Sequence, residues 1–314
     1  MQVGIISPEA PDPVEDGTSP NARRTFRRRE GTGTGQGRQG RRESKGKSKG
    51  AIPLRPARLP EVQFVGEGLY VPSARTLALA DVHLGLEETL HDEGTLVPSG
   101  HVRAVLERLE GIVRALGQGG RGKLDGKLER VIVNGDLRHR FGPWTRRAWG
   151  EAQELLDYLE GIATEIVLIE GNHDGGSLAA LAEGREGVSV RRDYAVNGLW
   201  FVHGDREPKG IPEGVETIVI GHEHPAVGLR DPVTGRVETF KCFLVGAYRG
   251  RALVVQPALN PWTAGSDLLR EEPLSPLLSP GVLEECRVYP VGDDGRVLDF
   301  GPLRQLLQAT TMRR

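Results

Sequence analysis

Residues 167–174 read Val-Leu-Ile-Glu-Gly-Asn-His-Asp, an apolar run that ends in a polar tip. The apolar part has the length and composition of a buried strand. Gly171 lets the backbone turn sharply, so we expect the side chains of Asn172 and His173 to leave the strand end together. Functional groups just beyond the carboxyl ends of strands are typical of an open α/β site. A simple polar turn would also explain this stretch, so the other strand ends decide between a turn and a site.

Four further strand-like runs end in the same kind of polar tip. They are residues 77–80, 131–134, 199–202 and 218–220, and they lead into Asp81-Val-His83, Gly135-Asp136, His203-Gly-Asp205 and Gly221-His-Glu-His224. Five of the eight histidines lie in the five tips: His83, His173, His203, His222 and His224. Histidines on a solvated surface would not collect at strand ends, so the pattern predicts one functional site built from all five tips.

The order of the expected elements predicts the fold class. Helices are expected at about 100–116 and 144–161, with a short third helix after Ser177, and they alternate with strands. Later residues have the period of strands: 188–196 and 199–203 flank the hairpin turn Asn197-Gly198, and 227–230 and 237–245 flank a second turn. We therefore expect an α/β fold with a central β-sandwich, helices on its outer faces and a second half dominated by antiparallel strands.

The chain is expected to divide into a tail and one domain. Residues 1–52 are rich in Gly, Ser, Pro, Arg and Lys, and residues 21–50 hold eleven Lys or Arg against two acids. Such a segment cannot bury enough apolar surface to offset its loss of entropy, so we expect a disordered basic tail or a start of the gene placed too far upstream. The folded domain is expected over residues 53–314, with residues 266–314 as a C-terminal extension packed on it.

The composition is that of an ordinary globular protein, with 38% hydrophobic residues and a net charge of −2. No apolar run approaches the roughly 18 residues of a membrane span, and the first residues lack the features of a signal peptide. Cys242 and Cys286 form no CxxC pair and are interpreted as reduced thiols. We expect a cytoplasmic protein with no membrane partner, and the oligomeric state stays open.

The five tips, taken in order, resemble the calcineurin-like metallophosphoesterase superfamily. The motifs DxH, GD, GNHD, H and GHxH span Asp81 to His224. The stretches 79–85 (LADVHLG), 135–139 (GDLRH) and 256–265 (QPALNPWTAG) look like the archaeal phosphoesterase branch related to the repair-nuclease subunit SbcD, and ligase/helicase-associated phosphoesterases carry a similar tail. The resemblance implies the calcineurin-like phosphoesterase fold, an α+β four-layer arrangement in which two mixed sheets are flanked by helices.

The resemblance also implies a dinuclear metal site. Carried over motif by motif, the ligands are Asp81, His83 and His224 for the first metal, Asn172, His203 and His222 for the second, and Asp136 as the bridge between them. Mixed oxygen and imidazole donors suit borderline divalent metals. We expect two divalent ions, with Mn²⁺ as the first choice and Fe, Zn, Ni or Co as alternatives.

The implied activity is hydrolysis of a phosphate ester, with a phosphodiester as the preferred substrate. By resemblance, a hydroxide that bridges the metals attacks phosphorus and His173 assists the leaving group. Five more residues are candidates for orienting a ligand or contacting phosphate: His139, Arg138, Arg140, Asp174 and Asp205. His139 stands where many phosphatases of the superfamily carry Asp or Asn, which is similar to the repair nucleases. The alternatives are a partly exposed histidine, solvated arginines and, for Asp174, a helix cap.

The sequence leaves other functions open. A nucleic-acid-binding accessory, or a nuclease-like subunit of DNA repair, could use the basic tail to contact phosphates, and nucleic acid could equally enter as the substrate. A phosphomonoesterase and a cyclic-nucleotide phosphodiesterase also fit, because no motif reads a base or a sugar. A metal-binding module without turnover is disfavoured, since His173 is present.

We predict that residues 1–52 are dispensable for hydrolysis, because every candidate site residue lies after them. A chain that starts at Pro53 should fold and keep its kcat/KM for a phosphodiester within about twofold of the full chain, as expected for removal of an unpacked terminus. Limited proteolysis should cut between Arg23 and Lys49 and leave an active core. A truncated chain that fails to fold would place the domain boundary elsewhere.

Overall fold

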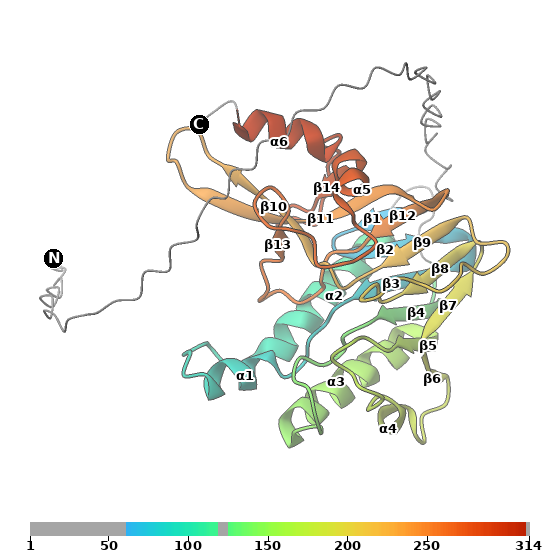
Figure 1. Cartoon of the computed structure of the whole chain (residues 1–314). Helices are drawn as coiled ribbons and strands as arrows, with labels where there is room; N and C mark the ends of the chain where they lie inside the picture. The colour runs from blue at the N-terminus through green and yellow to red at the C-terminus, as the bar shows by residue number, and fades with distance from the viewer. Residues whose placement is uncertain (1–60, 119–124, 312–314) are drawn as a thin grey trace, which may run out of the picture. The chain divides into compact units, whose positions relative to one another are not determined.

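Two mixed β-sheets organise the residues that this computed structural model describes, 61–118 and 125–311 (Figure 1). The first sheet has the order β1 (Gln63–Val65), β2 (Gly68–Val71), β3 (Thr76–Ala80), β4 (Leu128–Asn134), β5 (Ala163–Ile169) and β6 (Val188–Arg191). The second has the order β13 (Ser266–Asp267), β10 (Pro225–Arg230), β11 (Val237–Tyr248), β12 (Arg251–Val255), β9 (Thr217–Ile220), β8 (Leu199–Val202) and β7 (Asp193–Val196), with β14 (Arg287–Pro290) paired to β11. The tail expected at residues 1–52 lies outside the described residues.

Helices cover the outer faces of both sheets, as expected for this fold class (Figure 1). Their bounds are α1 (Leu86–Asp92), α2 (His101–Gln118), α3 (Arg146–Ile162), α4 (Ala179–Ala182), α5 (Pro280–Glu285) and α6 (Leu303–Thr311), with a 3₁₀ turn η1 (Pro72–Ala74). Thr145 caps α3, because its Oγ1 accepts a hydrogen bond from the Ala148 amide at 3.1 Å. In the described part of the chain, no helix combines the length and the apolar composition that crossing a lipid bilayer requires.

The two-residue period of the strands sorts apolar side chains into separate layers. In β4, Val131 and Val133 belong to the cluster that includes residues of α2 and α3, whereas Ile132 belongs to the cluster between the sheets. In β12, Leu253 packs toward α5 and α6 while Val254 faces the first sheet. The molecule therefore has the layer order helix, sheet, sheet, helix, and the expected four-layer sandwich is confirmed.

One expected strand is wrong in its extent. The sequence predicts a single strand over residues 188–196, but β6 and β7 are separate strands in different sheets. β6 runs parallel to β5, whereas β7 pairs antiparallel with β8 across the predicted turn at Asn197 and Gly198. The apolar residues of the two halves pack in different layers, Val188 and Val190 on the helix side and Tyr194 and Val196 between the sheets. Alternation alone could not reveal that change of sheet.

One further detail differs from expectation. The second sheet is less antiparallel than expected, because β9 lies between β8 and β12 and runs parallel to both. A parallel β9 directs its carboxyl end to the same edge as the end of β8, which positions the site described below.

The C-terminal segment belongs to the second sheet. Its strand β14 pairs with β11, and β13 runs parallel to β10. Leu277, Leu283 and Leu303 are buried in the outer apolar cluster of this sheet. Cys242 and Cys286 are buried free thiols in the same cluster, in line with the expected reduced state.

We predict that the contact between the sheets dominates stability. Leu199 is fully buried there, whereas the side chain of Leu96 is 95% exposed. Leu199→Ala should lower the free energy of unfolding by about 2–5 kcal/mol, while Leu96→Ala should change it by less than about 0.5 kcal/mol. Urea denaturation followed by circular dichroism measures both, and equal losses would contradict the assigned layer.

Candidate metal centre

Five strand ends from the two sheets meet at one edge. β3, β4 and β5 are parallel neighbours in the first sheet, and β8 and β9 are parallel neighbours in the second. Their carboxyl ends carry the predicted site residues Asp81, His83, Asp136, Asn172, His173, His203, His222 and His224. The structure brings all eight side chains together, as a 3.4 Å separation between His203 Nε2 and Asp136 Oδ2 across the sheets illustrates.

The backbone at these tips is strained. Among the described residues, eight non-glycine residues have a positive φ, and five of them are Asp81 (53°), His83 (53°), Asp136 (38°), His222 (62°) and His224 (48°). Each such conformation costs roughly 1–3 kcal/mol and persists only where the surrounding packing imposes it. Most of the strained residues are candidate ligands. The backbone strain therefore marks these strand ends as a functional site, whatever the types of the residues there.

Close packing explains the glycines of the GD and GNHD motifs. A Cβ atom at Gly135, where φ is +87°, would overlap the imidazole of His203. A Cβ atom at Gly171 would overlap the carboxylate and the amide of Asp136. Both positions therefore need a residue without a side chain so that the tips can approach one another.

The first group of donors consists of Asp81, His83 and His224. The Nε2 atoms of the two imidazoles lie 3.1 Å apart, and His224 Nε2 lies 3.6 Å from Asp81 Oδ2. Burial and the neighbouring His224 lower the pKa of His83 to about 3, so its imidazole is neutral and can act as a ligand. This group coincides with the residues assigned to the first metal by resemblance.

The second group consists of Asp136, His203 and His222, with Asn172 beside them. His203 Nε2 lies 2.8 Å from Asn172 Oδ1 and 3.4 Å from Asp136 Oδ2. Asp136 Oδ2 also lies 3.9 Å from His83 Nε2, so this carboxylate stands between the two groups. That position is the one a bridging ligand requires.

Two divalent cations fit the chemistry of this donor set. Asp81 Oδ1 and His203 Nδ1 are buried 3.6 Å apart, and neither has a hydrogen-bond partner among the described residues, so a cation could engage this edge without breaking a hydrogen bond between them. Burial opposes the charged form of His203, yet the carboxylates of Asp136 and Asp81 raise its pKa to about 9. Burial also opposes ionisation of Asp136, yet the hydrogen bond and charge of His203 hold its pKa well below its ordinary value. The carboxylates at this edge of the sheets therefore stabilise positive charge. Carboxylates together with neutral imidazoles are good ligands for borderline divalent metals.

His173 lies beside both groups and is partly exposed. Its Nδ1 donates a hydrogen bond to the carbonyl oxygen of His139, and its backbone amide donates to Asp136 Oδ1 at 2.9 Å. Its Nε2 lies 3.9 Å from Asp136 Oδ2. The carbonyl partner fixes the tautomer, so Nε2 is the nitrogen that faces the site.

His139 offers another grouping of imidazoles. Its Nδ1 lies 3.4 Å from His83 Nδ1, and His83, His139 and His173 together form a third set of donors within metal-binding range of one another. Burial and the charge of His173 lower the pKa of His139. His139 is thus in contact with a candidate ligand, as one of the sequence interpretations expects.

Arg138 and Asp174 connect the GD and GNHD tips. Contrary to the alternative of a solvated arginine, Arg138 is 4% exposed, and its guanidinium donates to the carbonyl oxygens of His173, Asp174 and Gly142. The Asp174 carboxylate accepts from the amides of Gly171, Arg138 and Leu137. Burial raises the pKa of Asp174 to about 7 despite these hydrogen bonds. The pair holds the two loops in register.

Arg140 and Asp205 remain near the surface. Arg140 pairs with Asp92 at 2.6 Å, and both side chains are more than half exposed. The Asp205 carboxylate pairs with Arg206 at 2.7 Å, and its charge contributes to raising the pKa of His203. Asp205 therefore influences the site through the electrostatic effect of its charge on the imidazole of His203.

Sequence reasoning missed Glu223, the residue between the two histidines of GHxH. It is fully buried, and its Oε2 accepts hydrogen bonds at 2.8 Å from the amides of Leu274 and Ser275. Burial raises its pKa to about 7. Glu223 thereby attaches the C-terminal segment to the tip that presents His222 and His224. The sequence did offer a signal for Glu223, which is an acidic residue between two candidate metal-binding histidines.

Two residues of the 256–265 stretch were also missed. Gln256 donates to the carbonyl oxygen of Ala78 and accepts from Asn134 Nδ2, which links the two sheets below the site. Asn260 Oδ1 lies 3.0 Å from Nε2 of the buried His101, which the sequence left as an ordinary histidine. Polar residues spaced through an apolar run could have indicated these buried contacts.

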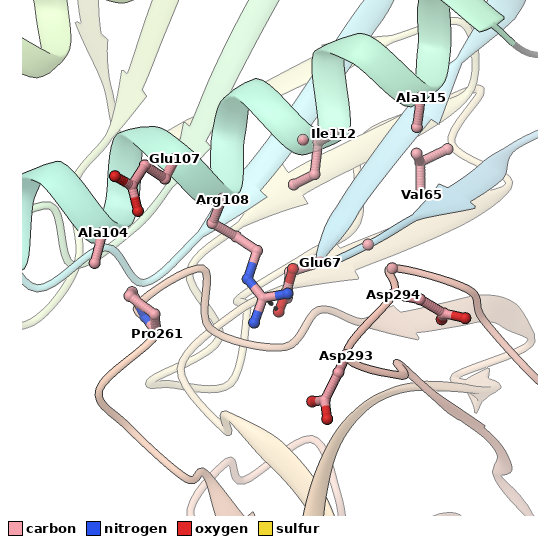
Figure 2. A pocket seen from close by; sticks show the side chains of 13 residues that line it. Val65, Glu67, Ala104, Glu107, Arg108, Ile112, Ala115, Pro261, Asp293 and Asp294 are labelled. Atoms are coloured by element: carbon pink, nitrogen blue, oxygen red, sulfur yellow. Dashed lines mark ion pairs between the residues drawn. The ribbon is translucent and has the colours of Figure 1, made fainter.

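A separate cavity of about 480 Å³ lies against α2 and the turn between β1 and β2 (Figure 2). Its lining includes the carboxylates of Glu67, Glu107, Asp293 and Asp294 and one guanidinium, Arg108. It contains none of the candidate ligands, and its surplus of negative charge is unsuited to a phosphate ester. The strand tips are therefore the better candidate for the active site.

A comparison with protein families connects this geometry to a known group. Residues 74–220 match the family model of the calcineurin-like phosphoesterases. The matched range runs from the start of β3 to the end of β9 and includes four of the five tips. Together with the fold, the match supports the superfamily that the motifs resemble, whose members hydrolyse phosphate esters.

The solved structures that match this chain are distant in sequence. Nuclease MPE from Pseudomonas putida is 21% identical, with a TM-score of 0.48 over 78% of this chain and 98% of that chain. A protein of unknown function from Aquifex aeolicus is 13% identical, with a TM-score of 0.28 over 47% and 77%. An uncharacterized protein from Streptococcus pneumoniae, described as a predicted phosphoesterase, is 13% identical, with a TM-score of 0.28 over 71% and 91%. No curated protein matched the sequence.

We predict that Asp136 is needed to hold two metals close together. After reconstitution with excess Mn²⁺, elemental analysis of the wild type should approach two ions per chain, and Asp136→Asn should bind fewer, because an amide is a weaker ligand than a carboxylate. Asp157→Asn is the matched control, since its carboxylate is exposed and pairs with Arg185 rather than with a candidate ligand. An unchanged stoichiometry in Asp136→Asn would remove the bridging role.

Proposed function

We propose that this protein is a phosphoesterase that depends on two divalent metals and hydrolyses phosphodiesters. The observation that carries the proposal is the convergence of Asp81, Asp136 and five imidazoles of the strand tips into neighbouring groups of metal-binding side chains. The family match over residues 74–220 supports the reaction class. The motifs at 79–85 and 256–265 favour the SbcD-related branch and a cytoplasmic enzyme that meets nucleic acid.

Two sets of residues would hold the metals. Asp81, His83 and His224 would hold one, and Asn172, His203 and His222 the other, with Asp136 shared. The bound metals would polarise the phosphoryl group and lower the pKa of a water molecule toward neutrality. We favour Mn²⁺, because both sets mix oxygen and imidazole donors, and Fe, Zn, Ni and Co are the alternatives to compare.

His173 would supply the proton that the leaving oxygen needs. Because Nδ1–H donates to the carbonyl oxygen of His139, the proton given to the leaving oxygen would come from Nε2 of the doubly protonated imidazolium, and the imidazole would be left neutral with its proton on Nδ1. A positioned general acid of this kind contributes typically a factor of about 10²–10⁴ to the rate. The partial exposure of the imidazole keeps it accessible to a substrate that enters from solvent.

The available cations favour a diester over a monoester. A dianionic monoester usually needs a fixed guanidinium besides the metals. Within the described site, the guanidinium of Arg138 is bound to three carbonyl oxygens, and Arg140 is paired with Asp92 at the surface. A diester carries less charge, so the two metals and His173 could stabilise its transition state without a further cation.

We predict that His173→Ala retains the metals and loses most turnover. The expected loss in kcat is on the order of 10²–10⁴-fold, the contribution of a positioned acid. Metal content is measured in the same preparations, with His91→Ala as the control because His91 is exposed and bonds only to the Val97 carbonyl oxygen among the described contacts. Parallel loss of metal and activity would make His173 a ligand instead.

The proposed substrate class is tested with two chromogenic esters. Under the same metal, kcat/KM for bis-p-nitrophenyl phosphate should exceed kcat/KM for p-nitrophenyl phosphate, for the electrostatic reason given above. A clear preference for the monoester would refute the diesterase and favour a phosphomonoesterase with the same metals. Absence of hydrolysis of both esters across Mn²⁺, Fe²⁺, Zn²⁺, Ni²⁺ and Co²⁺ would contradict the enzyme itself.

A further inference from the structure

An exposed aromatic ring covers the candidate general acid. Phe141 stacks on His173 with ring centroids 4.2 Å apart and planes inclined by 25°. One face of Phe141 is thus occupied by the imidazole, yet 63% of the residue remains exposed. Single exposed aromatic residues are common on surfaces, but this one is stacked on the candidate general acid, and its open face is turned away from that imidazole.

The loop that carries Phe141 is held on both sides. The Arg138 guanidinium binds the carbonyl oxygen of Gly142, and the carbonyl oxygen of His139 accepts from His173 Nδ1. These contacts fix the backbone before and after Phe141. Its ring is therefore ordered before any ligand arrives, so stacking on it would cost little conformational entropy.

The neighbouring residue adds a positive charge. Arg140 is exposed and paired with Asp92 at the surface. Surface ion pairs of this kind stabilise a protein by only about 0–1 kcal/mol, so Arg140, which is not fixed at the scissile phosphate, could still exchange Asp92 for the phosphate of an adjoining nucleotide. An aromatic platform next to a cation is the combination by which proteins bind single-stranded nucleic acid without reading its sequence.

We propose that the open face of Phe141 is a stacking subsite for the nucleobase next to the scissile phosphodiester. The proposal rests on the phosphodiesterase function and names its substrate class, a nucleic acid strand or a nucleotide ester with an unpaired base. Phe141 has no hydrogen-bonding group, so the subsite should accept any base.

Hydrolysis of two matched diesters tests the subsite. Thymidine 5′-(p-nitrophenyl phosphate) and methyl p-nitrophenyl phosphate share a leaving group and differ in the presence of a nucleoside. Phe141→Ala should lower kcat/KM for the thymidine ester on the order of 5- to 150-fold, the range for loss of one stacked base. The methyl ester should change by less than about twofold, and Phe141→Trp should retain the preference for the thymidine ester, because it keeps a stacking face.

Equal losses on both esters would overturn the proposal, because Phe141 would then act only by positioning His173. A wild type that hydrolyses the methyl ester as well as the thymidine ester would also overturn it, while leaving the diesterase intact. Phe141→Leu separates the two roles further, since it keeps apolar contact with the imidazole but removes the aromatic face.

Binding without turnover distinguishes failure of the subsite from failure of the enzyme. In EDTA, the full chain should bind a fluorescent oligothymidylate of about ten nucleotides more tightly than an abasic oligonucleotide of equal length, and Phe141→Ala should abolish the difference. Phosphate contacts made anywhere in the chain cancel in this comparison, because both strands carry the same charges. Equal affinities in the wild type would refute the subsite even if both diesters are hydrolysed.

Discussion

Two buried carboxylates where the strand tips meet are the constraint on which the rest of the structure depends. Asp81 is fully buried and Asp136 is 2% exposed, and five imidazoles of the strand tips surround them. Charge in such a place is costly unless it is compensated. Without metals the carboxylates raise the pKa of His203, so its proton offsets part of the charge. Bound divalent metals would replace that proton, because a ligating imidazole must be neutral. The fold is organised to keep these groups together against that cost.

Support for the candidate site comes from side chains outside the groups of candidate ligands. Arg138 and Asp174 fix the GD and GNHD loops to one another. Gln256 and Asn134 connect the two sheets beneath the tips, and Glu223 joins the C-terminal segment to the second sheet's ligands. These hydrogen bonds explain how five residues are held at a positive φ, since such strain is stable only where its surroundings leave no alternative.

The sequence predicts much of this architecture because its patterns are local. Runs such as 131–133 alternate between two buried faces, and the polar tips follow each run directly, so strands and site could be placed together. The change of sheet between β6 and β7 could not be predicted, because Val190 and Tyr194 satisfy the same alternation in either sheet. The burial of Arg138 was equally hidden, since its partners are backbone carbonyl oxygens whose positions depend on the folded loops.

Location of the bound metal tests the central claim most directly. Crystals grown with Mn²⁺ should give two anomalous peaks at the manganese edge, one among Asp81, His83 and His224 and one among Asn172, His203 and His222, with Asp136 between them. The dinuclear centre would be contradicted by a single anomalous peak or by a peak among His83, His139 and His173. It would also be contradicted if no peak appeared at the strand tips.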